Sequence, residues 1–333
     1  MRISVLYNKP TARFTKKTTH LVAEEDTEES AVEVAEALKE KGAVPTLVPI
    51  TELDTKKVIM ALPDDVVFNL IEWTGIDTPY AVKAYEYIHA RNLVYTGAAL
   101  DTYLLSCDKS VMKKRLDEKD LPTARWQLFH TGNEPVRQDF RYPLIVKVSS
   151  EHSSVGLSKE AIVQDEANLI LIVKKRLIEY KQPVYAEEFL TGREFQVTLL
   201  ERASGLTMLP VSEVRYNKGT DVPFLTYASR WDATHSDYDN SEVLLAKLTP
   251  ALQRKIEDMS KRAFTTFGYR DYARFDVRCQ GEEPVFLEIN SNPGLSDDEE
   301  YGMTVSYKAA GMTFADFVWE IVRSTLRRNK LKV

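Results

Sequence analysis

Two pairs of polar residues, each spaced two positions apart, could build a reaction centre: Arg274 with Asp276, and Glu288 with Asn290. Side chains two positions apart on a strand point to the same face. If the two strands pair with these faces together, two carboxylates, an amide oxygen and a guanidinium meet. Such oxygen ligands suit Mg²⁺, which proteins usually hold with a few carboxylates plus substrate phosphates. Arg274 would then stand where a cation can stabilise developing negative charge.

The elements that must position these side chains are two strands joined by a turn. β-branched and aromatic residues alternate with others in residues 272–277 and again from residue 286 onward, which is typical of strands. Gln280-Gly281 supplies the turn between them. A surface hairpin with a plain Arg–Asp ion pair is the alternative interpretation. The ending Asn290-Ser291-Asn292-Pro293-Gly294 favours the metal site.

The composition of the 333-residue chain is that of an ordinary globular protein, with 44% apolar and 28% charged residues. A net charge of −6 without a basic block argues against nucleic acid or an anionic membrane as the main partner. Cys107 and Cys279 are the only cysteines, so neither a zinc pattern nor a disulfide framework is indicated. The sequence has no signal-like N-terminus and no membrane-spanning apolar run, so we expect a cytoplasmic protein.

Three units are predicted along the chain. In residues 1–107, short apolar strands alternate with helices, which predicts a doubly wound parallel sheet. Its first helix is expected to begin at a capping box formed by Asp26 and Glu29, after a long loop. Residues 108–190 and 191–333 are predicted to form two smaller units that mix helices and strands. The strands expected in the first unit are residues 3–7, 46–48, 66–71 and 93–95.

A small, hydroxyl-rich segment, residues 149–156, follows Lys147 at the end of an apolar strand. Its backbone amides and hydroxyls could wrap phosphate oxygens. The alternative is a plain mobile loop. The chain contains neither Gly-x-x-x-x-Gly-Lys-Ser/Thr nor, after its first strand, Gly-x-Gly-x-x-Gly, so a P-loop and a dinucleotide fold are not indicated.

Taken together, these motifs resemble the ATP-grasp superfamily and, within it, the D-alanine–D-alanine ligase family. The resemblance spans nearly the whole chain and is densest from Lys109 to Gly311. It implies an ATP-grasp fold of the α/β class, with an N-terminal doubly wound parallel-sheet domain, a small central α+β domain and a C-terminal α+β domain. The segments that carry it are residues 145–147, 153–159, 187–195, 272–277, 287–294 and 309–314.

The resemblance implies how ATP would be held. Lys109 and Lys147 would bind its phosphates as compact cations. Glu187 would accept a hydrogen bond from the adenine amine, and the backbone from Glu188 to Leu190 would hold the edge of the ring. Glu194 would bind the ribose hydroxyls.

The resemblance also assigns the hairpin. Asp276, Glu288 and Asn290 would hold two Mg²⁺ ions, with Mn²⁺ able to replace them, and the ions would bridge phosphate oxygens. Arg274 and the backbone amide of Gly294 would stabilise the tetrahedral oxyanion.

The implied reaction joins a small-molecule carboxylate to an amine, both expected to be amino acids. The carboxylate attacks the γ-phosphate of ATP, and the amine then displaces phosphate from the acyl phosphate. Ser154 would help to position the first substrate. Arg230 and Trp231 fall where the family's mobile loop closes over the site, although an exposed loop pair is the alternative. A homodimer through the N-terminal unit is also implied.

The sequence departs from the family around its substrates. Where the family has hydroxyl residues for the second substrate's carboxylate, this chain has Ser296 followed by four acidic residues, among them Glu299. If these acids face the pocket, the second substrate should be cationic or lack a free carboxylate; the alternative is a solvated charged face. An altered ligase is therefore the main hypothesis. An acyl phosphate-forming enzyme with a non-amine acceptor and a non-catalytic nucleotide-binding module are the other two.

Overall fold

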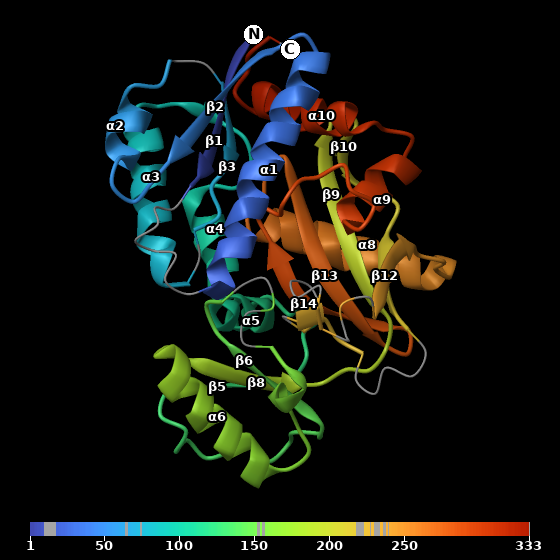
Figure 1. Ribbon diagram of the computed structural model, residues 1–333. Coiled ribbons are helices and arrows are strands. Elements are labelled where there is room, and N and C mark those ends of the chain that lie inside the picture. The colour runs from blue at the N-terminus through green and yellow to red at the C-terminus, as the bar shows by residue number, and fades with distance from the viewer. Residues whose placement is uncertain are drawn as a thin grey trace.

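In the computed structural model, the described residues form three sheets, two of four strands and one of six, one in each predicted unit (Figure 1). Among the described residues, no helix combines the length and the apolar composition needed to cross a membrane. The structure describes residues 1–9, 18–63, 66–73, 75–151, 154, 157–217, 223–226, 228–229, 234–235, 238 and 240–332.

The N-terminal sheet is parallel, with strand order β2-β1-β3-β4, as the strand–helix alternation predicted. Alternate residues of its strands point to opposite faces, and both faces are buried, which is the normal condition of a parallel sheet. Its elements are β1 (Arg2–Asn8), α1 (Thr18–Glu40), β2 (Val44–Ile50), α2 (Thr55–Met60), β3 (Val66–Leu70), η1 (Gly75–Asp77), α3 (Thr78–Ala90), β4 (Val94–Tyr95) and α4 (Leu100–Cys107).

The first helix begins earlier than the sequence indicated. Helix α1 starts at Thr18, so the predicted start at Asp26 was wrong, and residues 18–25 of the expected loop are helical. Residues 10–17 of that loop lie outside the described residues. The pattern of Asp26 and Glu29 lies inside the helix. A capping-box spacing can occur by chance within a longer helix, and residues 18–25 include good helix formers such as leucine, alanine and glutamate.

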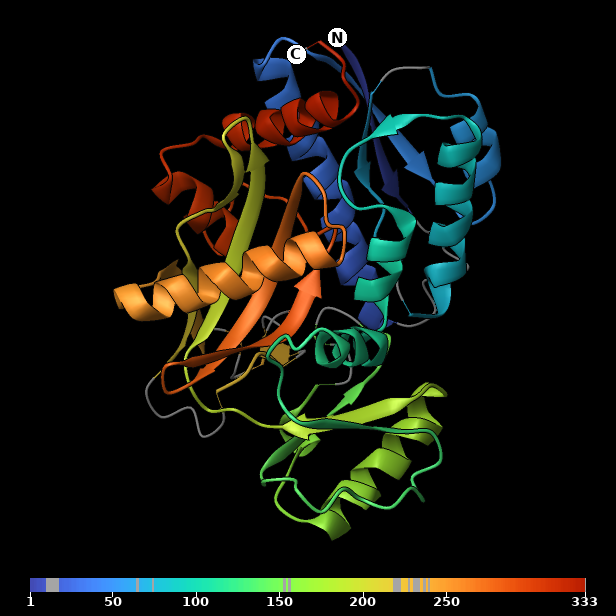
Figure 2. The same cartoon turned by 180° about the vertical axis from the view of Figure 1, so that it is seen from behind.

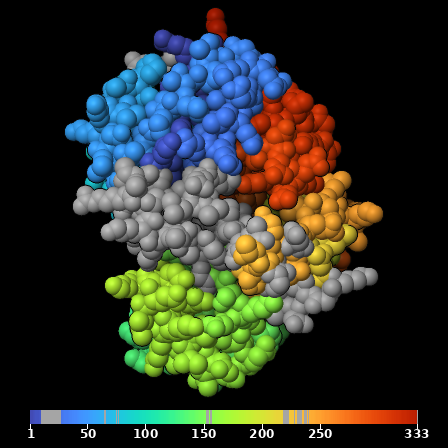
Figure 3. Space-filling view, in the orientation of Figure 1, coloured from blue at the N-terminus to red at the C-terminus, as the bar shows by residue number. Residues whose placement is uncertain are grey.

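The central unit is a small sheet of order β5-β8-β6-β7, in which every pair is antiparallel. Helix α6 covers one face with an apolar cluster, and the unit forms a lobe at one end of the molecule (Figure 3). The elements of this unit are α5 (Lys109–Glu118), β5 (Trp126–Phe129), β6 (Leu144–Val148), η2 (Lys159–Ala161), β7 (Ile162–Val163), α6 (Glu166–Tyr180) and β8 (Val184–Glu188).

The C-terminal sheet has an apolar face and a polar face. Helix α8 lies across the apolar face (Figure 2), where residues such as Phe195, Phe275 and Phe286 meet Ile256 and Ala263 of the helix. The opposite face carries the predicted site. The elements are β9 (Glu194–Arg202), β10 (Gly205–Met208), β11 (Ser212–Tyr216), β12 (Ser241–Leu245), α8 (Pro250–Thr266), β13 (Tyr272–Gln280), β14 (Glu283–Asn290), α9 (Gly302–Ala309) and α10 (Phe314–Arg328).

The N-terminal and C-terminal units share a core. Ile3 and Val5 of β1 belong to the same buried cluster as Phe317 and Ile321 of α10, and α10 lies against α1. The two chain ends therefore lie close together (Figure 1). The predicted boundaries at residues 107 and 190 separate the sheets, but the core crosses from the first unit to the third, so the boundaries stay predictions.

A buried carboxylate, that of Asp271, links the segments that meet beside this shared core. Asp271, which is fully buried just before β13, accepts hydrogen bonds from the Gly97 amide at 2.8 Å, Ser324 Oγ at 2.9 Å and Thr325 Oγ1 at 2.7 Å. It also forms an ion pair with Arg328 Nη2 at 2.8 Å. One side chain therefore links the N-terminal unit, the start of β13 and helix α10.

Candidate active site

The hairpin of β13 and β14 brings the four predicted residues together. In its register, Asp276 lies opposite Glu288, and Arg274 lies opposite Asn290. Both pairs are on the polar face, because their neighbours Phe275 and Ile289 belong to the apolar core beneath α8. The condition that the sequence left open, that the two faces coincide, is met.

A β-bulge makes this arrangement possible. Val277 pairs with Phe286 and Asp276 with Glu288, so Leu287 is an extra residue on β14. Strict alternation cannot place both Phe286 and Ile289 in the core, because they are three positions apart. The bulge absorbs the extra residue, and Leu287 lines the cavity above the polar face.

The hairpin carboxylate Asp276 is held by its neighbours. Arg274 forms an ion pair with it at 2.9 Å from Nε to Oδ1, and Asn290 Nδ2 donates to Asp276 Oδ2 at 3.1 Å. The side chains of Arg274 and Asp276 are each only 15% exposed. The Arg–Asp pair of the alternative interpretation is thus present, but it lies inside the molecule rather than on a surface hairpin.

The donors on this face fit Mg²⁺. Two carboxylates, Asp276 and Glu288, stand side by side in register, with the amide group of Asn290 next to them. Among the described residues, no group of three or more histidine, cysteine, aspartate or glutamate side chains could hold a metal by itself. The hairpin thus supplies a few hard oxygen ligands and leaves the remaining positions to phosphate oxygens and water, which is the usual arrangement for Mg²⁺.

Lys109, a lysine of the central unit, reaches the same place. Lys109 Nζ lies 2.8 Å from Glu288 Oε1 and donates to the carbonyl of Glu151 at 2.6 Å. Lys109 is the first residue of α5, which Asp108 caps by accepting from the amides of Ser110 and Val111. The cap fixes the direction in which the helix presents this lysine.

Glu187 is buried between two other cations. It lies 2.7 Å from Lys147 Nζ and 2.5 Å from Lys113 Nζ, and its own side chain is 1% exposed. Burial by itself would raise the pKa of the Glu187 carboxyl, but the charges of Lys113 and Lys147 outweigh it and lower the pKa. Glu187 is therefore an ionised hydrogen-bond acceptor at neutral pH.

Lys113 and Arg278 were missed in the sequence. Lys113 stands one helical turn after Lys109, and Arg278 continues the alternation of Arg274 and Asp276 on the same strand face, so spacing could have indicated both.

Arg278 holds Glu194, the residue expected at the ribose. Its Nη1 lies 2.9 Å from Glu194 Oε2, and Tyr216 donates to the same oxygen at 2.8 Å. The guanidinium also donates to the carbonyls of Gly192 and Pro223, and it lies over the ring of Phe189. Arg278 thereby fixes the direction of the Glu194 carboxylate.

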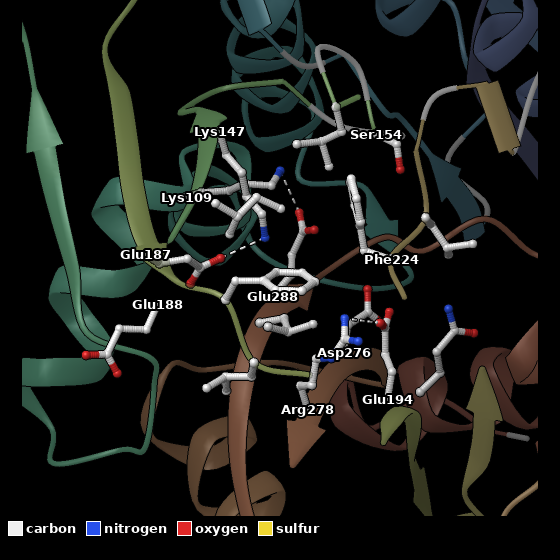
Figure 4. Close-up of a pocket in the computed structure, with 17 residues that line it drawn as sticks. Lys109, Lys147, Ser154, Glu187, Glu188, Glu194, Phe224, Asp276, Arg278 and Glu288 are labelled. Carbon is white, nitrogen blue, oxygen red and sulfur yellow. Dashed lines mark hydrogen bonds and ion pairs between the residues drawn. The ribbon is translucent and has the colours of Figure 1, made fainter. Parts of the chain in front are cut away.

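A narrow cavity of about 110 Å³ lies between the central and C-terminal sheets, and its lining includes Lys109, Glu187, Glu194 and Arg278 (Figure 4). Ser154 and Leu190 also line it. Glu188 lines it too, but its carboxylate is directed away, toward Arg125 at 3.3 Å and the Arg141 amide at 3.0 Å (Figure 4). Only the backbone at Glu188 can therefore face a ligand in this cavity.

A second, larger cavity of about 610 Å³ adjoins Arg274. Glu299 lines it together with Arg274, so the structure brings these two predicted residues to one cavity. Gly294 lies between β14 and α9 and is half-buried; its oxyanion role stays a prediction. Arg230 and Trp231 lie outside the described residues, and their role stays a prediction as well.

Comparison with known proteins agrees with this geometry. A family model described as the D-ala D-ala ligase C-terminus matches residues 116–323. The chain belongs to the D-alanine–D-alanine ligase family. The uncharacterized protein y4sG of Sinorhizobium fredii is 30% identical over 271 residues, covering 81% of this chain and 77% of that protein. A D-alanine–D-alanine ligase of Thermotoga maritima is 27% identical over 305 residues, covering 91% and 94%.

Solved structures share the fold of this member of the family. A D-alanine–D-alanine ligase from Bacillus anthracis, complexed with ATP, gives a TM-score of 0.74 at 20% identity and covers 99% of both chains. The enzyme from Coxiella burnetii gives 0.71 at 16% identity and covers 99% of this chain and 95% of its own. The predicted ATP-grasp fold is confirmed. Family membership makes the chain a ligase that forms carbon–nitrogen bonds, with ATP and Mg²⁺ as the family's general requirements and small molecules as substrates.

Proposed function

We propose that this ligase joins a small-molecule carboxylate to an amine through an acyl phosphate, with a second-substrate pocket that differs from the family's usual one. The observation that carries the proposal is the polar face of the β13–β14 hairpin. It presents Arg274, Asp276, Glu288 and Asn290 in register, within reach of Lys109. A nucleotide-binding module has no need for paired carboxylates and a charge-stabilising arginine at one place.

The residues of the narrow cavity support a nucleotide site. Lys109 and Lys147 would exchange their carboxylate partners for phosphate oxygens, which are stronger partners for a compact cation.

Glu187, kept ionised by Lys113, would accept a hydrogen bond from the adenine amine. Glu194, oriented by Arg278, would accept from the ribose hydroxyls, and the Leu190 amide would meet the ring edge. At about 110 Å³ the cavity is smaller than typical ligand sites, so the two lysine side chains must swing aside as ATP enters.

The chemistry has two steps. An oxygen of the donor carboxylate attacks the γ-phosphorus, the bond to the bridging oxygen breaks, and ADP leaves. The acceptor nitrogen then attacks the acyl carbon, the bond from carbon to the phosphate oxygen breaks, and phosphate leaves with that electron pair while the nitrogen loses a proton.

Asp276, Glu288 and Asn290 would hold Mg²⁺, which neutralises phosphate charge. Arg274 would stabilise the tetrahedral oxyanion, and Ser154 would position the donor.

Three finer points of the proposal rest on the family resemblance. The site would hold two metal ions, and Mn²⁺ could replace Mg²⁺. The chain would form a homodimer through its N-terminal unit. Amino acids are the class in which we expect to find the donor.

ADP release with a pool of amino acids, measured with and without Mg²⁺, tests the proposal. We expect Mg²⁺-dependent release and an amide product detected by mass. Hydroxylamine added in place of the amine should give the hydroxamate of the activated carboxylate. Hydroxamate without any amide product, whatever the amine, would point to a non-amine acceptor. Tight ATP binding with neither product would overturn the proposal in favour of a binding module.

Arg278→Met should weaken ATP binding. Without the ion pair to Arg278, Glu194 keeps only the hydrogen bond from Tyr216 among its described partners, so its carboxylate is less well oriented. We expect the KM for ATP to rise roughly tenfold, in line with losses at supporting residues, with a smaller change in kcat. Steady-state kinetics and calorimetric titration with ATP measure this. Arg254→Met, an exposed arginine on α8, is the matched control. An unchanged KM with a reduced kcat would contradict the assigned role.

A further inference from the structure

The second cavity has the position expected for the amine substrate. Arg274 and Gln196 place it on the polar face of the C-terminal sheet, directly beside the hairpin carboxylate Asp276. Its other walls come from β11, from β12, from the segment before and at the start of α9, and from Leu225, Ser229 and Tyr238 between β11 and β12. At about 610 Å³ it is large enough for a ligand well beyond the size of alanine. The inference below rests on the proposed ligase function, because it concerns the acceptor in that reaction.

The walls of this cavity are acidic. Among the described residues, four carboxylates line it: Glu242 of β12, and Asp298, Glu299 and Glu300 of the segment before α9. Among the described lining residues, Arg274 is the one cation, and its charge is already balanced by Asp276. The sequence allowed the acidic run to be either a pocket wall or a solvated charged face. In the structure, Asp298, Glu299 and Glu300 line the second cavity.

The acidic segment is held in place by several contacts. The Asp297 amide donates to Glu33 of α1 at 2.8 Å, and the Glu300 amide donates to the Asp298 carboxylate at 2.9 Å. At the start of α9, a Cβ on Gly302 would lie 2.1 Å from Gln196 Oε1 and 2.5 Å from Ser212 Oγ. This close approach fixes the segment against the polar sheet face, so its carboxylates are part of the cavity wall.

Nearby cations only partly balance these charges. Lys308 lies 3.4 Å from Glu299, and Arg215 lies 3.7 Å from Glu242, but all four side chains are more than a third exposed and their pairing is screened by water. In the sequence, residues 217–240 contain two basic residues and four aspartates, so this stretch brings no excess of positive charge. The described part of the cavity wall therefore has a net negative charge.

We propose that the acceptor is an amine that carries a second positive charge and has no free α-carboxylate, such as a linear diamine. One nitrogen would attack the acyl phosphate in its neutral form, and the other, protonated, would lie against the carboxylates of Glu299, Glu300 and Glu242. A carboxylate-bearing acceptor such as D-alanine would be repelled by the same wall, since like charges at a recognition site act against the wrong partner.

The test compares cadaverine, D-alanine and D-alaninamide as acceptors, with any carboxylate donor that gives a hydroxamate. We expect a kcat/KM for cadaverine at least about 100-fold above that for D-alanine. In Glu299→Gln/Glu300→Gln, the ratio of kcat/KM for cadaverine to that for D-alaninamide should fall at least about tenfold. A loss of folding would lower both values and leave the ratio unchanged. Glu86→Gln, an exposed glutamate on α3, is the control.

The outcomes separate this inference from the proposed function. Hydroxamate formation with preference for D-alanine, or an unchanged ratio in a double variant that circular dichroism shows to be folded, overturns the acceptor assignment and leaves the ligase. If no carboxylate gives a hydroxamate, the ligase proposal fails. Calorimetric titration with cadaverine and with D-alanine, in the presence of a non-hydrolysable ATP analogue, then still decides the pocket's preference. Tighter binding of cadaverine supports the acidic acceptor site, and equal or tighter binding of D-alanine contradicts it.

Discussion

Glu288→Gln is expected to abolish turnover while leaving the fold intact. Glu288 lies opposite Asp276 and next to Lys109, so it is one of only two carboxylates that the hairpin offers to a metal. The substitution keeps the side-chain volume but removes a ligand and a charge. Replacing even a residue that merely supports a ligand costs 10- to 100-fold, so we expect kcat/KM to fall by at least roughly 10². ADP release across a range of Mg²⁺ concentrations, with circular dichroism for the fold, measures it.

Glu283→Gln provides the matched control for this variant. It lies on the same strand, at the turn end, where its exposed side chain pairs with Lys255. We expect its activity to match that of the unchanged protein. Near-normal turnover of Glu288→Gln at ordinary Mg²⁺ concentrations would remove Glu288 from the metal site.

Asp271→Ala should cause the largest loss of stability. The substitution leaves Arg328, Ser324 and Thr325 without their shared acceptor and removes the link to Gly97. Breaking a buried ion pair costs 3–5 kcal/mol, and because Arg328 can partly turn to water we expect a value near the lower end, about 3 kcal/mol. Urea unfolding followed by fluorescence and by circular dichroism measures the shift in midpoint.

Asp258→Ala, an exposed aspartate on α8, is the comparison for Asp271→Ala. A substitution on the surface away from special features should change stability by no more than about 0.5 kcal/mol. If the two variants unfold at the same urea concentration, the buried cluster around Asp271 does not fasten the shared core.

The chemistry of the polar sheet face could be predicted from the sequence, because side chains two apart on a strand must share a face. The pairing register of β13 and β14 could not be predicted in this way. Whether Asp276 meets Glu288 depends on the bulge at Leu287, and that bulge exists because Phe286 and Ile289 both need the apolar core beneath α8. The apolar residues must pack on one face of the hairpin while the carboxylates align on the other. The folded sheet shows how both requirements are met, and the sequence does not.

Other parts of the site depend on contacts between distant segments. Glu187 lines the narrow cavity, and its predicted contact with adenine stays a prediction. Its burial between Lys113 and Lys147 joins a helix and two strands that are far apart in sequence. The acidic run at Asp298 to Glu300 was ambiguous for the same reason. Its sequence fits a solvated face, and only the anchoring of α9 on the sheet shows that it also walls a cavity.

The core shared by β1 and α10 also sets an order of events during synthesis. The N-terminal sheet emerges from the ribosome first, yet one of its faces, which includes Ile3, Val5 and Phe68, is completed by Phe317 and Ile321 near the chain's end. Until α10 has been made, that face lacks part of its cover and exposes apolar surface. The core of the central lobe differs, because its described residues all lie between Phe129 and Ala186. One face of the first sheet to be made therefore reaches its final packing only after the last helix has been synthesised.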